Sequence, residues 1–229
     1  MDGSLATKPA LLAEKVTIAL TDAGKKFNRD WIFRNLNYTF QSGKNYAITG
    51  PNGSGKSTLL QVLASSTNVS EGKIYVTTQS NSIANFHTAT EIESENLYQY
   101  ISMAAPYLEL VEEMTVTEFL QFHSVFKPLM LSVAEIIAVI GLEKAATKQI
   151  RYYSSGMKQR VKLAQAIFSN SPILLLDEPC SNLDKEGYQL YSELIQQFAQ
   201  HKLIIVGSND PQEYAFCNQQ VNLMDYKKA

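Results

Sequence analysis

Cysteine is scarce in this chain of 229 residues, which carries only Cys180 and Cys217. Two cysteines are too few for a disulfide framework and lack the spacing of a metal site, so we expect two free thiols. The longest apolar runs, at 173–176 and 203–206, are far shorter than the ~20 residues that a membrane-spanning helix needs. Residues 1–13 show no basic segment followed by an apolar core, so they do not resemble a secretion signal. These absences predict a cytosolic protein that does not itself cross a membrane.

Neither sign of charge is in excess. Lys and Arg number 20 and Asp and Glu number 22, which gives a net charge of −2 and a pI of about 6.0. This balance argues against general binding of nucleic acids, which requires a basic surface. Histidine is also rare: His87, His123 and His201 are scattered, and none lies at metal-ligand spacing, so we interpret them as surface or packing residues. The hydrophobic share of 45% is sufficient for a packed core.

Short apolar runs alternate with longer helical patterns, which is typical of an α/β protein with strands at its centre. The predicted strands cover 16–20, 32–40, 46–49, 73–78 and 173–176. Helices are predicted over 57–64 and within 115–170. In the second stretch, Ser132 and Glu135 form a capping-box pair, and Gly141 is a stop signal. A helical insertion therefore separates an early glycine-rich loop from the buried strand at 173–176.

The glycine-rich loop satisfies the phosphate-loop pattern, which is glycine, four residues and then Gly-Lys-Ser. Its glycines let backbone N–H groups wrap a phosphate chain, and the following helix adds its positive N-terminal end. Lys56 would reach the β- and γ-phosphates, and the Ser57 hydroxyl would ligate Mg²⁺. A strand before the loop and a helix after it favour this interpretation over a chance glycine turn. The predicted nucleotide-binding residues here are Gly50, Pro51, Asn52, Gly53, Ser54, Gly55, Lys56, Ser57 and Thr58.

The buried run at 173–176 ends in two acidic residues, Asp177 and Glu178. A buried strand that delivers carboxylates at its C-terminal end, beside a phosphate loop, is what a nucleotide site requires. Asp177 would hold Mg²⁺ through water, and Glu178 would polarise the attacking water as general base. The alternative is a strand that leads into a surface turn, and the presence of Lys56 favours the nucleotide site.

A third segment, Tyr153-Ser154-Ser155-Gly156-Met157, opens a predicted helix. The phosphate loop, this Ser-x-Gly segment, Asp-Glu-Pro at 177–179 and Ser-Asn-Leu-Asp at 181–184 follow in an order that resembles the ATP-binding cassette (ABC) ATPases over about residues 16–225. The resemblance implies a P-loop NTPase (RecA-like) core with an N-terminal antiparallel β subdomain and an inserted α-helical subdomain. Residues 1–229 would then form a single ABC ATPase domain, with a nucleotide-binding core lobe at 1–95 and 166–229 and a helical lobe at 96–165.

In that family two cassettes pair head to tail, and each ATP lies between one subunit's phosphate loop and the other's signature helix. The resemblance therefore implies ATP and Mg²⁺ as cofactors, with Ser154 and Gly156 binding the γ-phosphate across the interface and 181–184 forming the D-loop. Phe27 occupies the place of the aromatic residue that stacks on adenine, and Trp31 is a second candidate. Core packing is the alternative interpretation of either ring.

The sequence departs from the family pattern at the signature and at the Q-loop. Ser155 and Met157 stand where the commonest signature has Gly and Gln. Pro106 aligns with the usual Q-loop glutamine and offers no side-chain ligand, so Glu109 or Gln99 is a hypothetical substitute. Three tyrosines near this loop mark either a partner-facing patch or core packing; they are Tyr98, Tyr100 and Tyr107.

A third departure is Asn209, which stands where the family usually has a histidine. Its amide can donate a hydrogen bond to the γ-phosphate but cannot become charged. The expected catalytic residues are therefore Glu178, Lys56 and Asn209, with active but slower hydrolysis of ATP.

These features predict the ATPase subunit of a membrane transporter. ATP binding would close a homodimer, or a pair with a related cassette, and hydrolysis would reopen it. A separate integral membrane permease would contact the helical lobe and hold the chain at the inner face of the cell membrane. The alternative is a soluble ABC ATPase that acts on nucleic acid or ribosomes, which the single cassette and the slightly acidic charge disfavour, so no nucleic acid is expected. A small-molecule kinase would leave the signature segment without a purpose.

Overall fold

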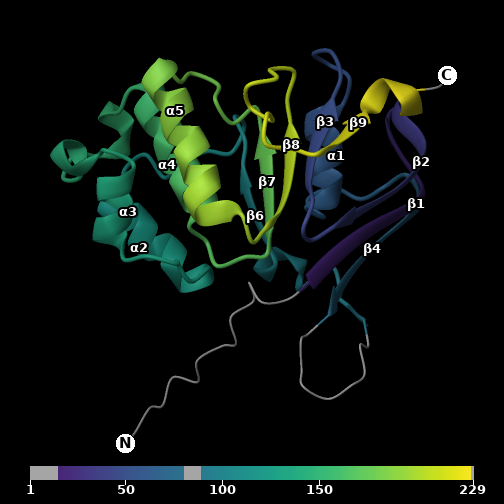
Figure 1. Cartoon of the computed structure of the whole chain (residues 1–229), viewed down its shortest axis with the longest axis horizontal. Helices are drawn as coiled ribbons and strands as arrows, with labels where there is room; N and C mark the ends of the chain where they lie inside the picture. The colour runs from purple at the N-terminus through teal and green to yellow at the C-terminus, as the bar shows by residue number, and fades with distance from the viewer. Residues whose placement is uncertain (1–14, 80–88, 228–229) are drawn as a thin grey trace, which may run out of the picture.

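The structure is a computed structural model that describes residues 15–79 and 89–227 (Figure 1). Its described strands form a four-stranded antiparallel sheet, in the order β2-β1-β4-β5, and a five-stranded parallel sheet, in the order β6-β7-β8-β3-β9. Helices α2 to α5 lie on one side of the parallel sheet, and the antiparallel sheet lies on the other (Figure 1). This mixed architecture confirms the predicted α/β class. Of the three histidines, His87 lies outside the described residues.

The antiparallel sheet contains three of the predicted strands and extends them. Its strands are β1 (Lys15–Phe27), β2 (Asp30–Gln41), β4 (Glu71–Gln79) and β5 (Thr90–Glu91). The sequence predicted an end near residue 20 for the first of these, but β1 continues to Phe27. Register shifts between Leu20 and Lys26, with Asp22 at a φ of 47°, interrupt the alternation of apolar and polar residues, which is why the pattern stops early.

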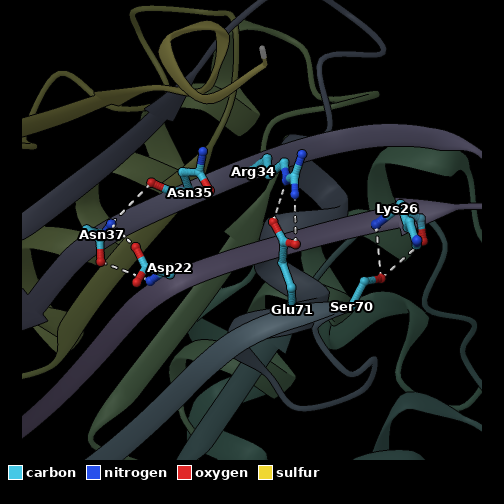
Figure 2. Close-up of polar contacts among 7 residues, drawn as sticks. All are labelled: Asp22, Lys26, Arg34, Asn35, Asn37, Ser70 and Glu71. Carbon is cyan, nitrogen blue, oxygen red and sulfur yellow. Dashed lines mark hydrogen bonds and ion pairs between the residues drawn. The ribbon is translucent and has the colours of Figure 1, made fainter. Parts of the chain in front are cut away.

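Side chains bridge this irregular part of the sheet. The Asp22 backbone N–H donates to Asn37 Oδ1 at 2.9 Å, and Asn37 Nδ2 donates to Asp22 Oδ1 at 2.8 Å (Figure 2). Arg34 on β2 also pairs with Glu71 on β4, with 2.6 Å between Nε and Oε1 (Figure 2). These contacts join strands where the backbone ladder is interrupted.

The central strands of the parallel sheet are apolar because both faces of the sheet are covered there. Its strands are β3 (Asn45–Thr49), β6 (Ile101–Ala104), β7 (Ile173–Asp177), β8 (Leu203–Gly207) and β9 (Gln219–Asn222). Every residue of β7 and β8 is buried. Alternate residues enter different cores: Leu174 and Leu176 join the helical side, whereas Ile173 and Leu175 join the core shared with α1 and the antiparallel sheet.

The α-helices begin close to where their capping signals predict. They are α1 (Lys56–Leu63), α2 (Val116–Phe126), α3 (Val133–Val139), α4 (Ser155–Ile167) and α5 (Lys185–Leu194), which continues as a π-helix at Ile195–Ala199. Both halves of the predicted Ser132–Glu135 capping box are present, and Gly141 follows the end of α3 with a φ of +67°. Short 3₁₀ turns connect these elements at Leu97–Gln99, Glu143–Ala145, Ile150–Tyr152 and Leu223–Tyr226.

One strand lies inside the range that the sequence assigned to the helical lobe. β6 pairs in parallel with β7, with Ile101 opposite Ile173 and Ala104 opposite Leu176, so the sheet extends into the 96–165 segment. Only four residues long, β6 is too short for its alternation to be recognised. Both described cysteines are free thiols, as expected. Among the described helices, none combines the length and the apolar character needed to traverse a lipid bilayer.

Candidate nucleotide-binding site

The glycine-rich loop connects β3 to α1 in the conformation that a phosphate loop needs. Gly50 and Gly55 have φ values of +146° and +107°, which L residues with side chains rarely adopt. A Cβ at Gly50 would lie 2.8 Å from Ser54 Oγ, and one at Gly55 would lie 2.2 Å from Ile32 Cγ2. Helix α1 begins at Lys56 with no acidic residue in its first turn, so its positive N-terminal end is available to an anion.

Lys56 folds back over this loop. The side chain is only 5% exposed, and its Nζ donates to the Gly50 carbonyl at 2.9 Å and to Asn209 Oδ1 at 2.9 Å. The Asn209 amide in turn donates to Asn52 Oδ1. Two phosphate-loop residues, Lys56 and Asn52, therefore meet Asn209 from a distant part of the sequence in one hydrogen-bonded chain above the loop.

Asp177 and Ser57 lie together at the base of the site. Asp177 is 1% exposed, and its Oδ1 has no hydrogen-bond partner among the described residues. Burial raises the pKa of this carboxyl and the Glu178 charge adds to the rise, whereas a hydrogen bond from Ser57 and the charge of Lys56 lower it. The Asp177 carboxylate has a buried oxygen with no hydrogen-bond partner, and it lies next to the Ser57 hydroxyl. Mg²⁺ prefers oxygen ligands of these two kinds. These residues fit the predicted metal ion.

Glu178 directly follows β7 in a strained backbone conformation. Its φ is +42°, which is uncommon for a residue with a long side chain, and its N–H donates to the Gly207 carbonyl at 2.9 Å. Glu178 lines a pocket of about 220 Å³ together with Asn52 and Asn209. The sheet order explains this meeting, because β8 lies between β7 and β3, and parallel strands all end at the same edge.

The signature residues lie elsewhere on the chain. Ser154 is the N-cap of α4, where its Oγ accepts a hydrogen bond from the Met157 N–H at 3.2 Å. Ser154 and Gly156 line a different pocket, of about 430 Å³, with D-loop residues Asn182 and Asp184. The structure therefore does not bring the signature to the phosphate loop of the same chain.

The two candidate adenine-stacking rings differ in their surroundings. Phe27 is 49% exposed, with the Lys25 ammonium 5.0 Å from its ring centroid, so it is not a core residue. Trp31 is contacted by two cations, Lys26 at 5.2 Å and Arg34 at 4.5 Å, and is only partly exposed. Of the two rings, Phe27 therefore has the larger exposed fraction and the fewer cation contacts.

The segment aligned with the Q-loop follows β6. Gln99 precedes β6, at the edge of the sheet opposite to the phosphate loop, so the hypothesis that it replaces the missing glutamine is wrong. Glu109 lies beyond Pro106 in a pocket with Lys158 and Lys162, and its role stays a prediction. The sequence also gave no signal for the tether at this loop, in which Lys162 Nζ donates to the Pro106 carbonyl at 2.8 Å.

Two of the three tyrosines near this loop are exposed. Tyr98 is 56% exposed and Tyr107 is 43% exposed, whereas Tyr100 packs against the core. The buried part of Tyr107 raises the pKa of its hydroxyl above the ordinary value, although a hydrogen bond with Gln61 opposes this rise. Core packing is therefore the wrong interpretation of Tyr98 and Tyr107.

The fold and this arrangement of loop, lysine and paired carboxylates define a P-loop ATPase of the cassette type. The family model described as "ABC transporter" matches residues 33–181, about two thirds of the chain, and the chain therefore belongs to this family. The predicted family, the P-loop NTPase fold and the ATPase class are thereby confirmed.

Individual relatives agree with this assignment. An uncharacterized ABC transporter ATP-binding protein of Bacillus subtilis, YybJ, is 29% identical over 208 residues, which cover 86% of this chain and 87% of the relative. The lipoprotein-releasing system ATP-binding protein LolD of Protochlamydia amoebophila is 28% identical over 85% of this chain and 86% of its own length. A solved ATP-binding cassette, a dimer in a post-hydrolysis state with ADP and Pi, superimposes with a TM-score of 0.70 at 23% identity, covering 90% of this chain and 94% of that one.

Proposed function

We propose that this chain binds and hydrolyses ATP as the subunit of an ABC transporter that drives a separate membrane permease through closure of a cassette dimer. The observation that carries the proposal is the convergence of Lys56, Asp177 and Glu178 at one edge of the parallel sheet. Chemistry at such a site consists of positioning and charge stabilisation, which these side chains can supply.

Each residue has a distinct task in this scheme. The backbone N–H groups of 50–57 wrap the phosphates, and Lys56 neutralises their charge. Ser57 and Asp177 would hold Mg²⁺, which would further neutralise the charge on the phosphate oxygens. Glu178 orients the attacking water and accepts its proton. As the bond from the water oxygen to the γ-phosphorus forms, the bond from that phosphorus to the β,γ-bridging oxygen breaks, and ADP leaves with the electron pair. Phe27 stacks on the adenine ring.

The second half of each site comes from another cassette. Ser154 and Gly156 line a pocket away from their own phosphate loop, and Ser154 lies at the exposed start of α4. In a head-to-tail pair, this helix N-terminus would meet the γ-phosphate of the partner's ATP. A solved cassette of similar fold, described as a dimer bound to ADP and Pi, supports the pairing of two cassettes.

A groove beside the Q-loop segment is the proposed contact with the permease. It encloses about 480 Å³ and is lined in part by Tyr98, Tyr107 and Lys127. Lys127 directly follows α2, on which Phe122 and Phe126 are 47% and 62% exposed. Exposed aromatic rings of this kind are typical of partner-binding surfaces. Binding there would hold the chain at the inner face of the membrane, with 96–165 acting as the helical lobe.

Two variants test the ATPase part of the proposal. Lys56→Ala should lose ATP affinity by about 100-fold, because a buried charge partner of the phosphates is removed, while the exposed Lys73→Ala should bind as wild type does. Glu178→Gln should still bind ATP, and it should form a stable dimer because the hydrolysis that reopens the dimer is blocked. Light scattering with ATP and Mg²⁺ would show this dimer as a doubled mass. A Glu178→Gln protein that remains monomeric at saturating ATP, also in the presence of a co-expressed permease, would contradict the dimer mechanism.

A further inference from the structure

A buried carboxyl group lies beside the site and outside the set of residues that the motifs predict. Glu213 is 3% exposed, and its Oε1 accepts a hydrogen bond of 2.7 Å from the backbone N–H of Cys180. Burial raises the pKa of Glu213, which the Ser208 hydroxyl and the Cys180 N–H lower. This bond joins the loop after β8 to the turn at 178–180.

Helix α5 fixes the same loop from a second direction. The Tyr191 hydroxyl donates to the Glu213 carbonyl at 2.8 Å, and the Tyr188 hydroxyl donates to Asp210 Oδ2 at 2.8 Å. Asp210 is the neighbour of Asn209, which contacts Lys56. Helix α5 therefore holds the loop at 208–213 at two points, Asp210 and Glu213.

The turn that Glu213 holds is the one that contains the expected general base. Glu178 has a φ of +42°, a conformation that such a residue keeps only when its surroundings impose it. One constraint lies at the start of the turn, where the Glu178 N–H donates to the Gly207 carbonyl at 2.9 Å. The bond from Cys180 to Glu213 is the constraint on the other side, two residues later. Glu178 and Glu213 also line the same pocket.

We propose that Glu213 is a positioning residue for ATP hydrolysis, which keeps the turn at 178–180 and the loop at 208–213 in register so that Glu178 and Asn209 face one substrate. This inference rests on the proposed function. Glu213 does not contact the nucleotide in this scheme and acts only through the Cys180 backbone. Its charge matters less than its acceptor oxygen, which a glutamine would preserve.

Two substitutions of similar volume separate this role from simple support of the fold. Glu213→Met fills the site but removes the acceptor, whereas Glu213→Gln keeps an oxygen for the Cys180 N–H. We expect Glu213→Met to lower kcat about 10- to 100-fold, because small displacements of catalytic groups have effects of this size, with the KM for ATP within about twofold of wild type. Glu213→Gln should retain at least about a third of the wild-type kcat. The control is Glu193→Met on the exposed face of α5, which should match wild type.

Hydrogen exchange at 178–184 provides a readout that does not depend on ATP hydrolysis. These amides should exchange about tenfold faster in Glu213→Met and at the wild-type rate in Glu213→Gln. Unchanged exchange in Glu213→Met overturns the inference, and so does a kcat loss that only parallels the loss of folded protein in a thermal melt. A wild-type chain without ATPase activity would defeat the proposed function, while the exchange measurement would still decide whether Glu213 holds the turn.

Discussion

The Nζ of Lys56 donates a hydrogen bond to Oδ1 of Asn209 at 2.9 Å, across 153 positions of sequence. Lys56 comes from the phosphate loop and Asn209 from the loop after β8, so the contact links the two ends of the predicted catalytic apparatus. A neutral amide can accept this bond and still donate to Asn52, as it does here. A protonated imidazole could not accept it, which makes position 209 a direct test of how this cassette differs from the family pattern.

Replacing Asn209 with histidine should accelerate hydrolysis. An imidazole can become charged next to the γ-phosphate, whereas the amide cannot, and we expect kcat to rise by about tenfold in Asn209→His. The measurement is steady-state phosphate release at saturating ATP. The exposed Asn68→His serves as control. Equal kcat values for wild type and Asn209→His would show that the asparagine does not limit the rate.

The adenine contact should depend on Phe27 more than on Trp31. Phe27→Ala removes a half-exposed ring available for stacking, so we expect ATP affinity to fall by about 5- to 30-fold, which corresponds to roughly 1 to 2 kcal/mol of ring interaction. Trp31→Ala removes a ring already engaged by Lys26 and Arg34, so it should reduce stability rather than affinity. Titration with a fluorescent ATP analogue distinguishes the two. Greater loss of affinity in Trp31→Ala would reassign the stacking residue.

Gly55 should not tolerate a side chain. In Gly55→Ala the new Cβ would lie 2.2 Å from Ile32 Cγ2 at a φ of +107°, so we expect a loss of about 2 to 4 kcal/mol in unfolding free energy. The matched control is Gly43→Ala, which has a φ of +87° but no atom within 4 Å of the added carbon, and should lose only about 1 kcal/mol. Urea denaturation measures both. Similar losses in the two variants would rule out the clash as the cause.

Stability should rise with pH above neutrality because of Lys202. This side chain is 1% exposed, its Nζ donates to the Ser169 carbonyl at 2.5 Å, and burial lowers its pKa to about 7. Between pH 7 and the ordinary lysine range, the unfolded chain binds a proton that the folded chain does not, so the unfolding free energy increases with pH. We expect Lys202 to contribute about 2 kcal/mol to the increase between pH 7 and 9. Thermal melts should show a smaller increase in Lys202→Met, and an equal one would contradict this origin.

The sequence by itself determined the nucleotide chemistry, because phosphate binding needs glycines, a lysine and a hydroxyl at fixed local spacing. The same holds for the helix starts, since a capping box such as Ser132 with Glu135 lies within four consecutive residues. The pairing of strands depends on residues that are far apart in the sequence, so a short segment does not reveal it. For this reason the sequence did not predict β6 or the irregular end of β1. The sequence around Glu213 is typical of a polar loop, and its neighbouring residues do not indicate that the Glu213 carboxyl is buried.

Only the tertiary structure decided which distant groups meet. The order β7-β8-β3 brings Glu178, Asn209 and Lys56 to one edge, and it places Gln99 at the other. The tertiary structure also places Ser154 at a pocket that is separate from the phosphate loop. The physical reason is that side-chain identity fixes what a group can bind or protonate, whereas strand order and burial fix which groups share a pocket and which of them lose contact with water.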